Sequence, residues 1–189
     1  AYVSNKFYGE PSKNLTVIGI TGTNGKTTTS YLIRSILEKS GDATGLIGTI
    51  SYFIKDKKYE ACHTTPEAPV FQAMLRHMLD EGCKFAISEV SSHALSQNRV
   101  SYTRFKIAVF TNLTRDHLDF HKNMEEYFLA KKRLFTKFLS EDGTAIINED
   151  DIYGQRILAE LKDSGRRIIT YSLKNNRADV CAINITTNF

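Results

Sequence analysis

The stretch that decides the fold is residues 17–28, VIGITGTNGKTT, where an apolar run leads into a glycine-rich loop and then a helical pattern. Glycines let backbone N–H groups turn inward around a phosphate, and the start of the following helix adds positive potential. Lys26 is placed to reach the β- and γ-phosphates, and Thr27 to ligate Mg²⁺. The loop therefore predicts binding of a nucleoside triphosphate by Gly22, Thr23, Asn24, Gly25, Lys26, Thr27 and Thr28.

The spacing departs from the common phosphate-loop pattern GxxxxGK[ST], because position 20 is Ile20 and not glycine. Counted from Gly22, the pattern is the shorter GxxGK[ST]. A glycine-rich turn that only caps a helix is the alternative interpretation. The position between a buried strand and an amphipathic helix favours the phosphate loop.

Outward from this loop, short apolar runs alternate with stretches of helical period. The runs are typical of strands buried on both faces, and they span residues 15–20, 46–50, 85–90, 107–113, 145–148 and 167–171. Helices are expected at 26–40, from an N-cap at Thr65 to a stop at Gly82, at 123–140 and at 150–163, with a small inserted hairpin at 52–54 and 59–62. The alternation predicts an α/β fold of the P-loop type, with a three-layer, mostly parallel sheet and helices on both faces.

The composition is that of a folded globular chain. The 189 residues are 41% hydrophobic and 11% aromatic, which excludes disorder, and no apolar run approaches the length of a membrane helix. A net charge of +4 does not mark a nucleic-acid binder. Cys62, Cys83 and Cys181 show no CxxC spacing and are expected to be reduced core residues of a cytoplasmic protein.

Both ends of the chain have the character of cut ends. Residues 1–14 resemble an interdomain linker, and the domain is expected to cover 15–189. No signal peptide is visible, and residues 184–189 look like the middle of a strand. The chain is therefore expected to be a piece of a larger protein.

Chemistry is expected in the loops at the carboxyl ends of the strands. Glu89 closes an otherwise apolar strand, and burying it is costly unless it binds a metal or forms an ion pair; a Mg²⁺ role is favoured. After it, Ser91 and Ser92 are candidates to cap a turn, and His93 alone is more often structural. Two further loops are expected at the same edge. Loop 111–121 carries two histidines and two aspartates, which could bind a metal or a phosphate or form only turn hydrogen bonds. Loop 63–67 has the pattern of a helix start, and its hydroxyl groups could contact a substrate.

Lys131 occupies an unexpected position. In the helix predicted over 123–140 it lies between Tyr127 and Leu134 on the inward apolar stripe. A long side chain that reaches out to solvent is the ordinary explanation. A buried lysine would instead have a lowered pKa and a reactive amine.

Together these motifs resemble the Mur ligases, ATP-dependent amide-forming enzymes of peptidoglycan synthesis. The resemblance rests on residues 19–28 (GITGTNGKTT), 63–67 (HTTPE), 89–99 (EVSSHALSQNR), 111–119 (TNLTRDHLD) and 127–131 (YFLAK). Within the family it is strongest to the type that adds the third amino acid. The family loop has the short form, which accounts for Ile20. The resemblance covers the central ATP-binding domain of a three-domain enzyme, so this chain alone is expected to be inactive.

The resemblance implies a reaction and a set of roles. ATP would phosphorylate the D-glutamyl carboxylate of UDP-N-acetylmuramoyl-L-alanyl-D-glutamate, and an amino acid would attack the acyl phosphate. Lys26, Lys131 and His117 would be catalytic. Thr27 and Glu89 would ligate one Mg²⁺, and Glu89, His117 and a carbamylated Lys131 a second. The substrate would contact Thr64, Thr65, Ser91, Gln97 and Arg99.

Two other functions are also compatible with these residues. Folylpolyglutamate synthase has the same fold and the GTNGK loop, and a non-catalytic nucleotide-binding module is the rival from another class. The TTPE and EVSSH segments favour the muramoyl substrate, and a module without activity has no need of Lys131 on an apolar face. The added amino acid cannot be read from these residues, and a monomer is expected.

Overall fold

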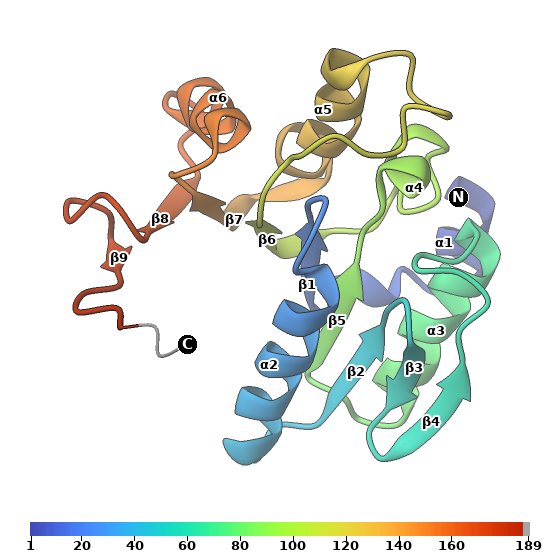
Figure 1. Ribbon diagram of the computed structural model, residues 1–189. Helices are drawn as coiled ribbons and strands as arrows, with labels where there is room; N and C mark the ends of the chain where they lie inside the picture. Colours follow the sequence, from blue (N-terminus) through green and yellow to red (C-terminus); the bar gives the residue numbers. More distant parts are fainter. Residues whose placement is uncertain (187–189) are drawn as a thin grey trace.

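The computed structural model describes residues 1–186 and contains one nine-stranded sheet in the order β4-β3-β2-β5-β1-β6-β7-β8-β9 (Figure 1). The strands are β1 (Thr16–Thr21), β2 (Thr44–Ile47), β3 (Ser51–Ile54), β4 (Lys57–Glu60), β5 (Phe85–Glu89), β6 (Phe105–Phe110), β7 (Leu139–Asn148), β8 (Arg167–Ser172) and β9 (Val180–Cys181). All neighbouring pairs are parallel except β2–β3 and β3–β4, which form the antiparallel part. The predicted mostly parallel sheet with an inserted hairpin is confirmed.

Helices cover both faces of the sheet, so the three-layer prediction is also confirmed. They are α1 (Tyr2–Phe7), α2 (Lys26–Lys39), α3 (Ala68–Asp80), α4 (Ser92–Ser96), α5 (Met124–Arg133) and α6 (Ile152–Leu161), with a 3₁₀ helix at Pro11–Lys13 and a π-helical turn at Leu134–Phe138. Helix α2 packs with Ile33 and Leu37 over the apolar residues of one face, such as Ile18 and Ile87. Helices α3, α4, α5 and α6 contribute to the larger core on the opposite face.

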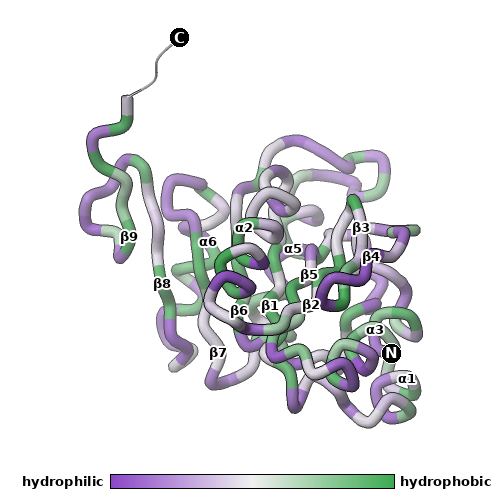
Figure 2. The backbone as a smooth tube through the Cα atoms, turned by 90° about the horizontal axis from the view of Figure 1, so that it is seen from below, coloured by the Kyte–Doolittle hydropathy of each residue, from purple (hydrophilic) through white to green (hydrophobic). Residues whose placement is uncertain are grey.

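The central strands are apolar because both of their faces are covered. Every residue of β2 is buried, as is every residue of β1 after Thr16. Figure 2 shows this as hydrophobic colour along the middle of the molecule, with hydrophilic colour mainly in the outer loops. The pairing sets Ile20 beside Glu89 and Thr21 beside Phe110, so β5, β1 and β6 end together at one edge.

Three helices have boundaries that differ from the prediction. Helix α3 begins at Ala68 with Glu67 as N-cap, because the hydroxyl of Thr65 is bonded to β5 and cannot cap. The helix predicted to reach residue 140 leaves α-helical geometry after Arg133 and ends at Phe138, since Leu139 is extended and pairs with Phe105. The last helix is shorter than 150–163.

The N-terminal segment contains more regular structure than predicted, and residues 184–186 contain less. Within residues 1–14, α1 packs against α3, and the hydroxyl of Ser12 accepts a hydrogen bond from the Arg104 amide at 3.1 Å. The linker role of this segment stays a prediction. The strand predicted over 184–189 is absent at 184–186, and residues 187–189 lie outside the described part.

The cysteine prediction was only partly right. All three thiols are free, but only Cys83 is buried, whereas Cys62 and Cys181 are exposed. Among residues 1–186 there is no helix long and apolar enough to cross a membrane.

Candidate active site

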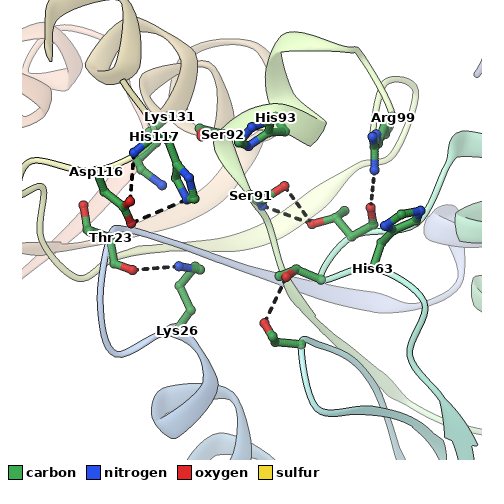
Figure 3. A pocket seen from close by; sticks show the side chains of 13 residues that line it. Thr23, Lys26, His63, Ser91, Ser92, His93, Arg99, Asp116, His117 and Lys131 are labelled. Atoms are coloured by element: carbon green, nitrogen blue, oxygen red, sulfur yellow. Dashed lines mark hydrogen bonds and ion pairs between the residues drawn. The ribbon is translucent and has the colours of Figure 1, made fainter. Parts of the chain in front are cut away.

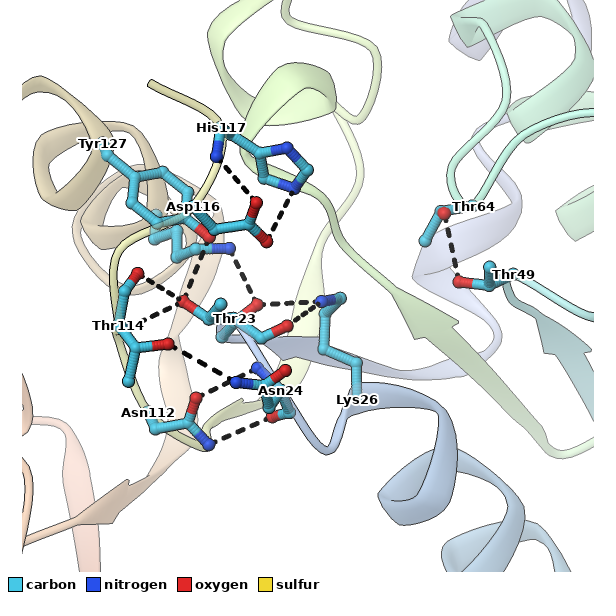
Figure 4. Close-up of polar contacts among 12 residues, drawn as sticks. Thr23, Asn24, Lys26, Thr49, Thr64, Asn112, Thr114, Asp116, His117 and Tyr127 are labelled. Atoms are coloured by element: carbon cyan, nitrogen blue, oxygen red, sulfur yellow. Dashed lines mark hydrogen bonds and ion pairs between the residues drawn. The ribbon is translucent and has the colours of Figure 1, made fainter. Parts of the chain in front are cut away.

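The phosphate loop is held in shape by the two residues that follow strand β6. The backbone at Gly22 has φ +149°, and a Cβ added there would lie 1.9 Å from Thr111 Oγ1, so only glycine fits. Thr111 Oγ1 donates to the Asn24 carbonyl at 2.7 Å. The Asn24 amide donates to Asn112 Oδ1 at 3.0 Å (Figure 4). Gly25, also at positive φ (+84°), is the N-cap of α2, and Lys26 is its first residue. Thr111 and Asn112, for which no individual role was predicted, thus fix the loop.

Lys26 folds back onto the loop that precedes it. Its ammonium group donates to the carbonyl oxygens of Gly22 and Thr23, both at 2.9 Å. Burial lowers its pKa, and the charges of Glu89 and Asp116 oppose that effect. An anion that replaced the two carbonyls would gain a charge-assisted contact from a side chain already in place.

Lys131 lies inside the protein, and its side chain does not reach solvent. The residue is only 1% exposed, and its ammonium group donates to the Gly22 carbonyl at 2.8 Å and lies 4.7 Å from the centre of the Tyr127 ring. Burial lowers its pKa well below the ordinary value, and the charge of Lys26 lowers it further, against a smaller opposing effect of Asp116. The predicted inward position is confirmed, and the explanation by a solvent-seeking side chain is wrong.

Glu89 is fully buried at the end of β5 and is bonded to threonines. Its carboxylate accepts hydrogen bonds from Thr27 Oγ1 at 2.9 Å, from Thr49 Oγ1 at 3.0 Å and from the Thr49 amide at 3.1 Å. No cation is among its hydrogen-bond partners in residues 1–186, which speaks against the structural ion pair. Carboxylate and hydroxyl oxygens are the ligands that Mg²⁺ prefers, so this donor set fits that ion. Thr49 was missed because the strand before it was expected to run to residue 50.

A pocket of about 430 Å³ opens between the phosphate loop and the start of α4 (Figure 3). It brings together eight of the predicted site residues: Thr23, Lys26, Thr64, Thr65, Ser91, Arg99, His117 and Lys131. It also contains five residues that had no assigned site role: Thr49, His63, Ser92, His93 and Asp116. The other seven predicted site residues do not line it: Gly22, Asn24, Gly25, Thr27, Thr28, Glu89 and Gln97. Gln97 nevertheless accepts a hydrogen bond from Arg99 at 2.8 Å.

The far side of the pocket is cross-linked through Thr65. Its hydroxyl donates to the Glu89 carbonyl at 2.8 Å and accepts from the Ser91 amide at 3.0 Å. Arg99 donates to the Thr65 carbonyl at 3.0 Å and pairs with Glu67 at 2.9 Å. Thr65 therefore fixes the loop of residues 63–67 against the end of β5. The guanidinium group of Arg99 lines the cavity with its charge only partly offset, by the pair with Glu67. Contacts of these residues with a substrate stay a prediction.

Histidines pack beside Lys131. The ring of His93 lies 5.0 Å from that of His117 and 4.1 Å from that of Phe120, and His121 packs 5.1 Å from Tyr127. Burial lowers the pKa of His93 and of His121, which favours the neutral form of both rings. Within residues 1–186, no three His, Cys, Asp or Glu side chains gather closely enough to hold a metal. The second predicted metal set therefore depends on what an altered Lys131 would add.

Comparison with known proteins identifies this arrangement. A family model described as "Mur ligase middle domain" matches residues 20–188. The chain belongs to this Mur ligase family. The diaminopimelate-adding ligase of Geobacter sulfurreducens, "UDP-N-acetylmuramoyl-L-alanyl-D-glutamate--2,6-diaminopimelate ligase", is 49% identical over 177 residues, which cover 91% of this chain and 34% of that protein. The ligase of the same name from Aquifex aeolicus is 47% identical over 186 residues, 98% of this chain and 37% of its own length.

Solved structures agree with the Mur ligase assignment. A structure of a ligase of the same name superposes with a TM-score of 0.80 at 34% identity, covering 95% of this chain and 38% of that one. MurF from Acinetobacter baumannii, at 21% identity and a TM-score of 0.73, covers 98% of this chain and 37% of that one, and shares the fold. The chain spans about a third of the length of the curated relatives that it matches.

Proposed function

We propose that this chain is the nucleotide-binding part of an ATP-dependent ligase that adds the third amino acid to UDP-N-acetylmuramoyl-L-alanyl-D-glutamate. The observation that carries the proposal is one pocket in which a phosphate loop, Lys26, Lys131 and the Arg99 side of the cavity meet. The names of relatives at 45–49% identity support the reaction and make 2,6-diaminopimelate the amino acid to test first.

In this proposal the loop residues Gly22 to Thr28 bind the phosphates of ATP. The backbone amides at the start of α2 and the Lys26 ammonium face that site, and Lys26 exchanges its carbonyl partners for phosphate oxygens. Transfer of a phosphoryl group spreads negative charge over its oxygens, and a fixed cation stabilises that charge as it develops. Lys26 is thus a catalytic residue.

Thr27 and Glu89 would hold one Mg²⁺, because their oxygens already lie within 2.9 Å of each other. A second Mg²⁺ would take Glu89, His117 and a modified Lys131. When bound, these ions neutralise charge on the phosphate oxygens. The metal-binding oxygens would be kept buried and oriented by three hydrogen bonds to the Glu89 carboxylate. One of these bonds comes from Thr27 and two come from Thr49.

The substrate carboxylate would enter from the side of Thr64, Ser91 and Arg99. Its oxygen attacks the γ-phosphorus of ATP, and the bond to the β–γ bridging oxygen breaks, which gives ADP and an acyl phosphate. The amine of the amino acid then attacks the acyl carbon, phosphate leaves, and an amide remains. Arg99, with Gln97 behind it, would orient the acidic substrate.

Lys131 is proposed to be carbamylated in the working enzyme. A buried ammonium beside Lys26 repels a metal ion and competes for phosphate, whereas a carbamate is an anion with two oxygen donors. The neutral amine attacks CO₂, a C–N bond forms and one proton leaves to solvent. Lowering of the Lys131 pKa by burial raises the fraction of that neutral amine.

The test uses the full-length protein with ATP and Mg²⁺. Turnover should need both the uridine-nucleotide dipeptide and an amino acid, and the chain of residues 1–189 should bind ATP without ligating. Turnover driven by a folate substrate would support the folylpolyglutamate reading, and turnover with no acceptor would support a switch module; either result would overturn the proposal. Likeness to folylpolyglutamate synthase structures, at 17–18% identity, extends to the fold alone.

A further inference from the structure

Ser92 has a buried hydroxyl group that nothing in the described chain satisfies. The residue is 1% exposed, and its Oγ is one of six buried side-chain polar atoms without a hydrogen-bond partner in residues 1–186. Of the residues that carry these atoms, only Ser92 lines the active-site pocket. Such an orphan hydroxyl costs stability, and at a functional site it indicates a group that binds there during function.

The neighbouring serine shows that the local fold does not need this hydroxyl. Ser91 caps α4, since its Oγ accepts a hydrogen bond from the Ala94 amide at 3.2 Å. Ser92 follows as the first residue of α4, where its own hydroxyl makes no contact of this kind. The second hydroxyl therefore has no structural task within the helix.

Ser92 and Lys131 face the same pocket from two helices that are fixed to each other. Helix α4 packs against α5, and Arg133 of α5 donates to the Leu95 carbonyl of α4 at 2.5 Å. Figure 3 shows Ser92 on the side of the pocket that also carries His117 and Lys131. A donor on α4 is thus held at a set position relative to the Lys131 amine.

Carbamylation would change the hydrogen-bond partners that the Lys131 side chain requires. The amine forms a bond to the carbon of CO₂ and loses one proton to solvent, which leaves one N–H and two anionic oxygens. The N–H can keep the present acceptor, the Gly22 carbonyl. The oxygens need donors, and the Ser92 hydroxyl is a donor in the same pocket without an acceptor.

We propose that Ser92 is a positioning residue, whose hydroxyl donates a hydrogen bond to the carbamate on Lys131 and stabilises that modification. The inference rests on the proposed function, because it requires Lys131 to be carbamylated. It adds a role for a residue outside the predicted catalytic and ligand sets.

The test measures carbamylation directly. Full-length protein is titrated with ¹³C-labelled bicarbonate, and the carbamate carbon is followed by ¹³C NMR in the wild type, Ser92→Ala, Ser92→Thr and the control Ser96→Ala. Ser96 ends the same helix and does not line the pocket. Loss of one charge-assisted hydrogen bond should raise the bicarbonate concentration for half-modification about tenfold in Ser92→Ala. Ser92→Thr and Ser96→Ala should behave as the wild type.

The outcomes distinguish the role of Ser92 from carbamylation of Lys131 itself. Equal titrations of the wild type and Ser92→Ala would overturn the role of Ser92 and leave carbamylation standing. No carbamate signal in the wild type at saturating bicarbonate would overturn the modification itself, and with it the role of Ser92, while ligase turnover is measured separately. Without bicarbonate, Ser92→Ala should melt no lower than the wild type; a lower melting temperature would point to a structural role instead.

Discussion

Lys26 and Lys131 donate hydrogen bonds to the same acceptor, the carbonyl oxygen of Gly22, at 2.9 and 2.8 Å. One lysine starts α2 and the other comes from α5, so the fold brings two ammonium groups together on one loop. Like charges this close repel, and burial removes the water that would screen them. In the proposed enzyme the phosphates of ATP attract Lys26 and carbamylation turns Lys131 into an anion, so both steps relieve this repulsion.

Replacing Lys131 by methionine should stabilise the fold and abolish the reaction. Methionine fills a similar volume and removes a buried charge that has no carboxylate among its hydrogen-bond partners. We expect the free energy of unfolding of residues 1–189 in urea to rise by about 1–3 kcal/mol. Turnover by the full-length Lys131→Met protein should be lost. A destabilised variant would mean that the ammonium group supports the fold.

A smaller side chain provides the chemical control for this position. Full-length Lys131→Ala should be inactive but folded, and added acetate should restore part of its turnover, because a carboxylate can enter the space and supply oxygens in place of the carbamate. Full activity without acetate would show that Lys131 takes no part in the reaction.

The stability of residues 1–189 should rise with pH on the alkaline side of neutrality. Burial lowers the pKa of Lys131 below the value of 10.5 for an unfolded lysine, so between the two values the unfolded chain binds more protons than the folded one. The free energy of unfolding then increases with pH up to about 10.5. Measured by urea denaturation without metal or bicarbonate, the slope should be smaller in Lys131→Met. Equal slopes would exclude Lys131 as its source.

Gly22→Ala should destroy the phosphate loop, whereas Gly41→Ala should not. Both glycines have positive φ, but an added Cβ meets Thr111 Oγ1 at 1.9 Å in the first case and nothing within 4 Å in the second. Gly41→Ala should therefore cost only the backbone strain, about 1–2 kcal/mol, and keep ATP binding. Gly22→Ala should cost more and lose ATP binding in calorimetric titration. Similar behaviour of the two variants would contradict the assigned loop geometry.

Much of this architecture was predictable from the sequence, because its signals are local. The buried strands, the inserted hairpin and the loop around Lys26 each follow from apolar runs and glycine positions. The inward position of Lys131 followed from helical spacing alone, and the structure confirms it.

Other features depend on contacts between distant segments. The start of α3 was wrong because the capping hydroxyl of Thr65 is engaged by β5, 24 residues away. The helix after Arg133 ends early because Leu139 pairs with β6. Thr111 fixes the phosphate loop from 87 residues away, which no local pattern indicates. The orphan state of the Ser92 hydroxyl likewise appears only when its surroundings are known.

Glu89→Gln should weaken the binding of ATP only when Mg²⁺ is present. Glutamine keeps the shape of the side chain but removes the negative charge and puts an N–H₂ group where one oxygen now accepts from Thr27 or Thr49. Affinity for ATP with Mg²⁺ should fall at least about tenfold, while affinity for ATP in EDTA should change little. The exposed Glu60→Gln serves as control. An equal loss in EDTA would place Glu89 in the fold rather than at a metal.

ATP-driven amide formation through an acyl phosphate leaves an isotope signature in the released phosphate. The full-length protein is given ATP, Mg²⁺, 2,6-diaminopimelate and UDP-N-acetylmuramoyl-L-alanyl-D-glutamate that carries ¹⁸O in the reacting carboxylate, and the released phosphate is analysed by mass spectrometry. We expect the carboxylate oxygen that attacks the γ-phosphorus to leave with the phosphate, so that one ¹⁸O atom appears in each phosphate formed from labelled oxygen. Amide product accompanied by unlabelled phosphate would contradict this expectation.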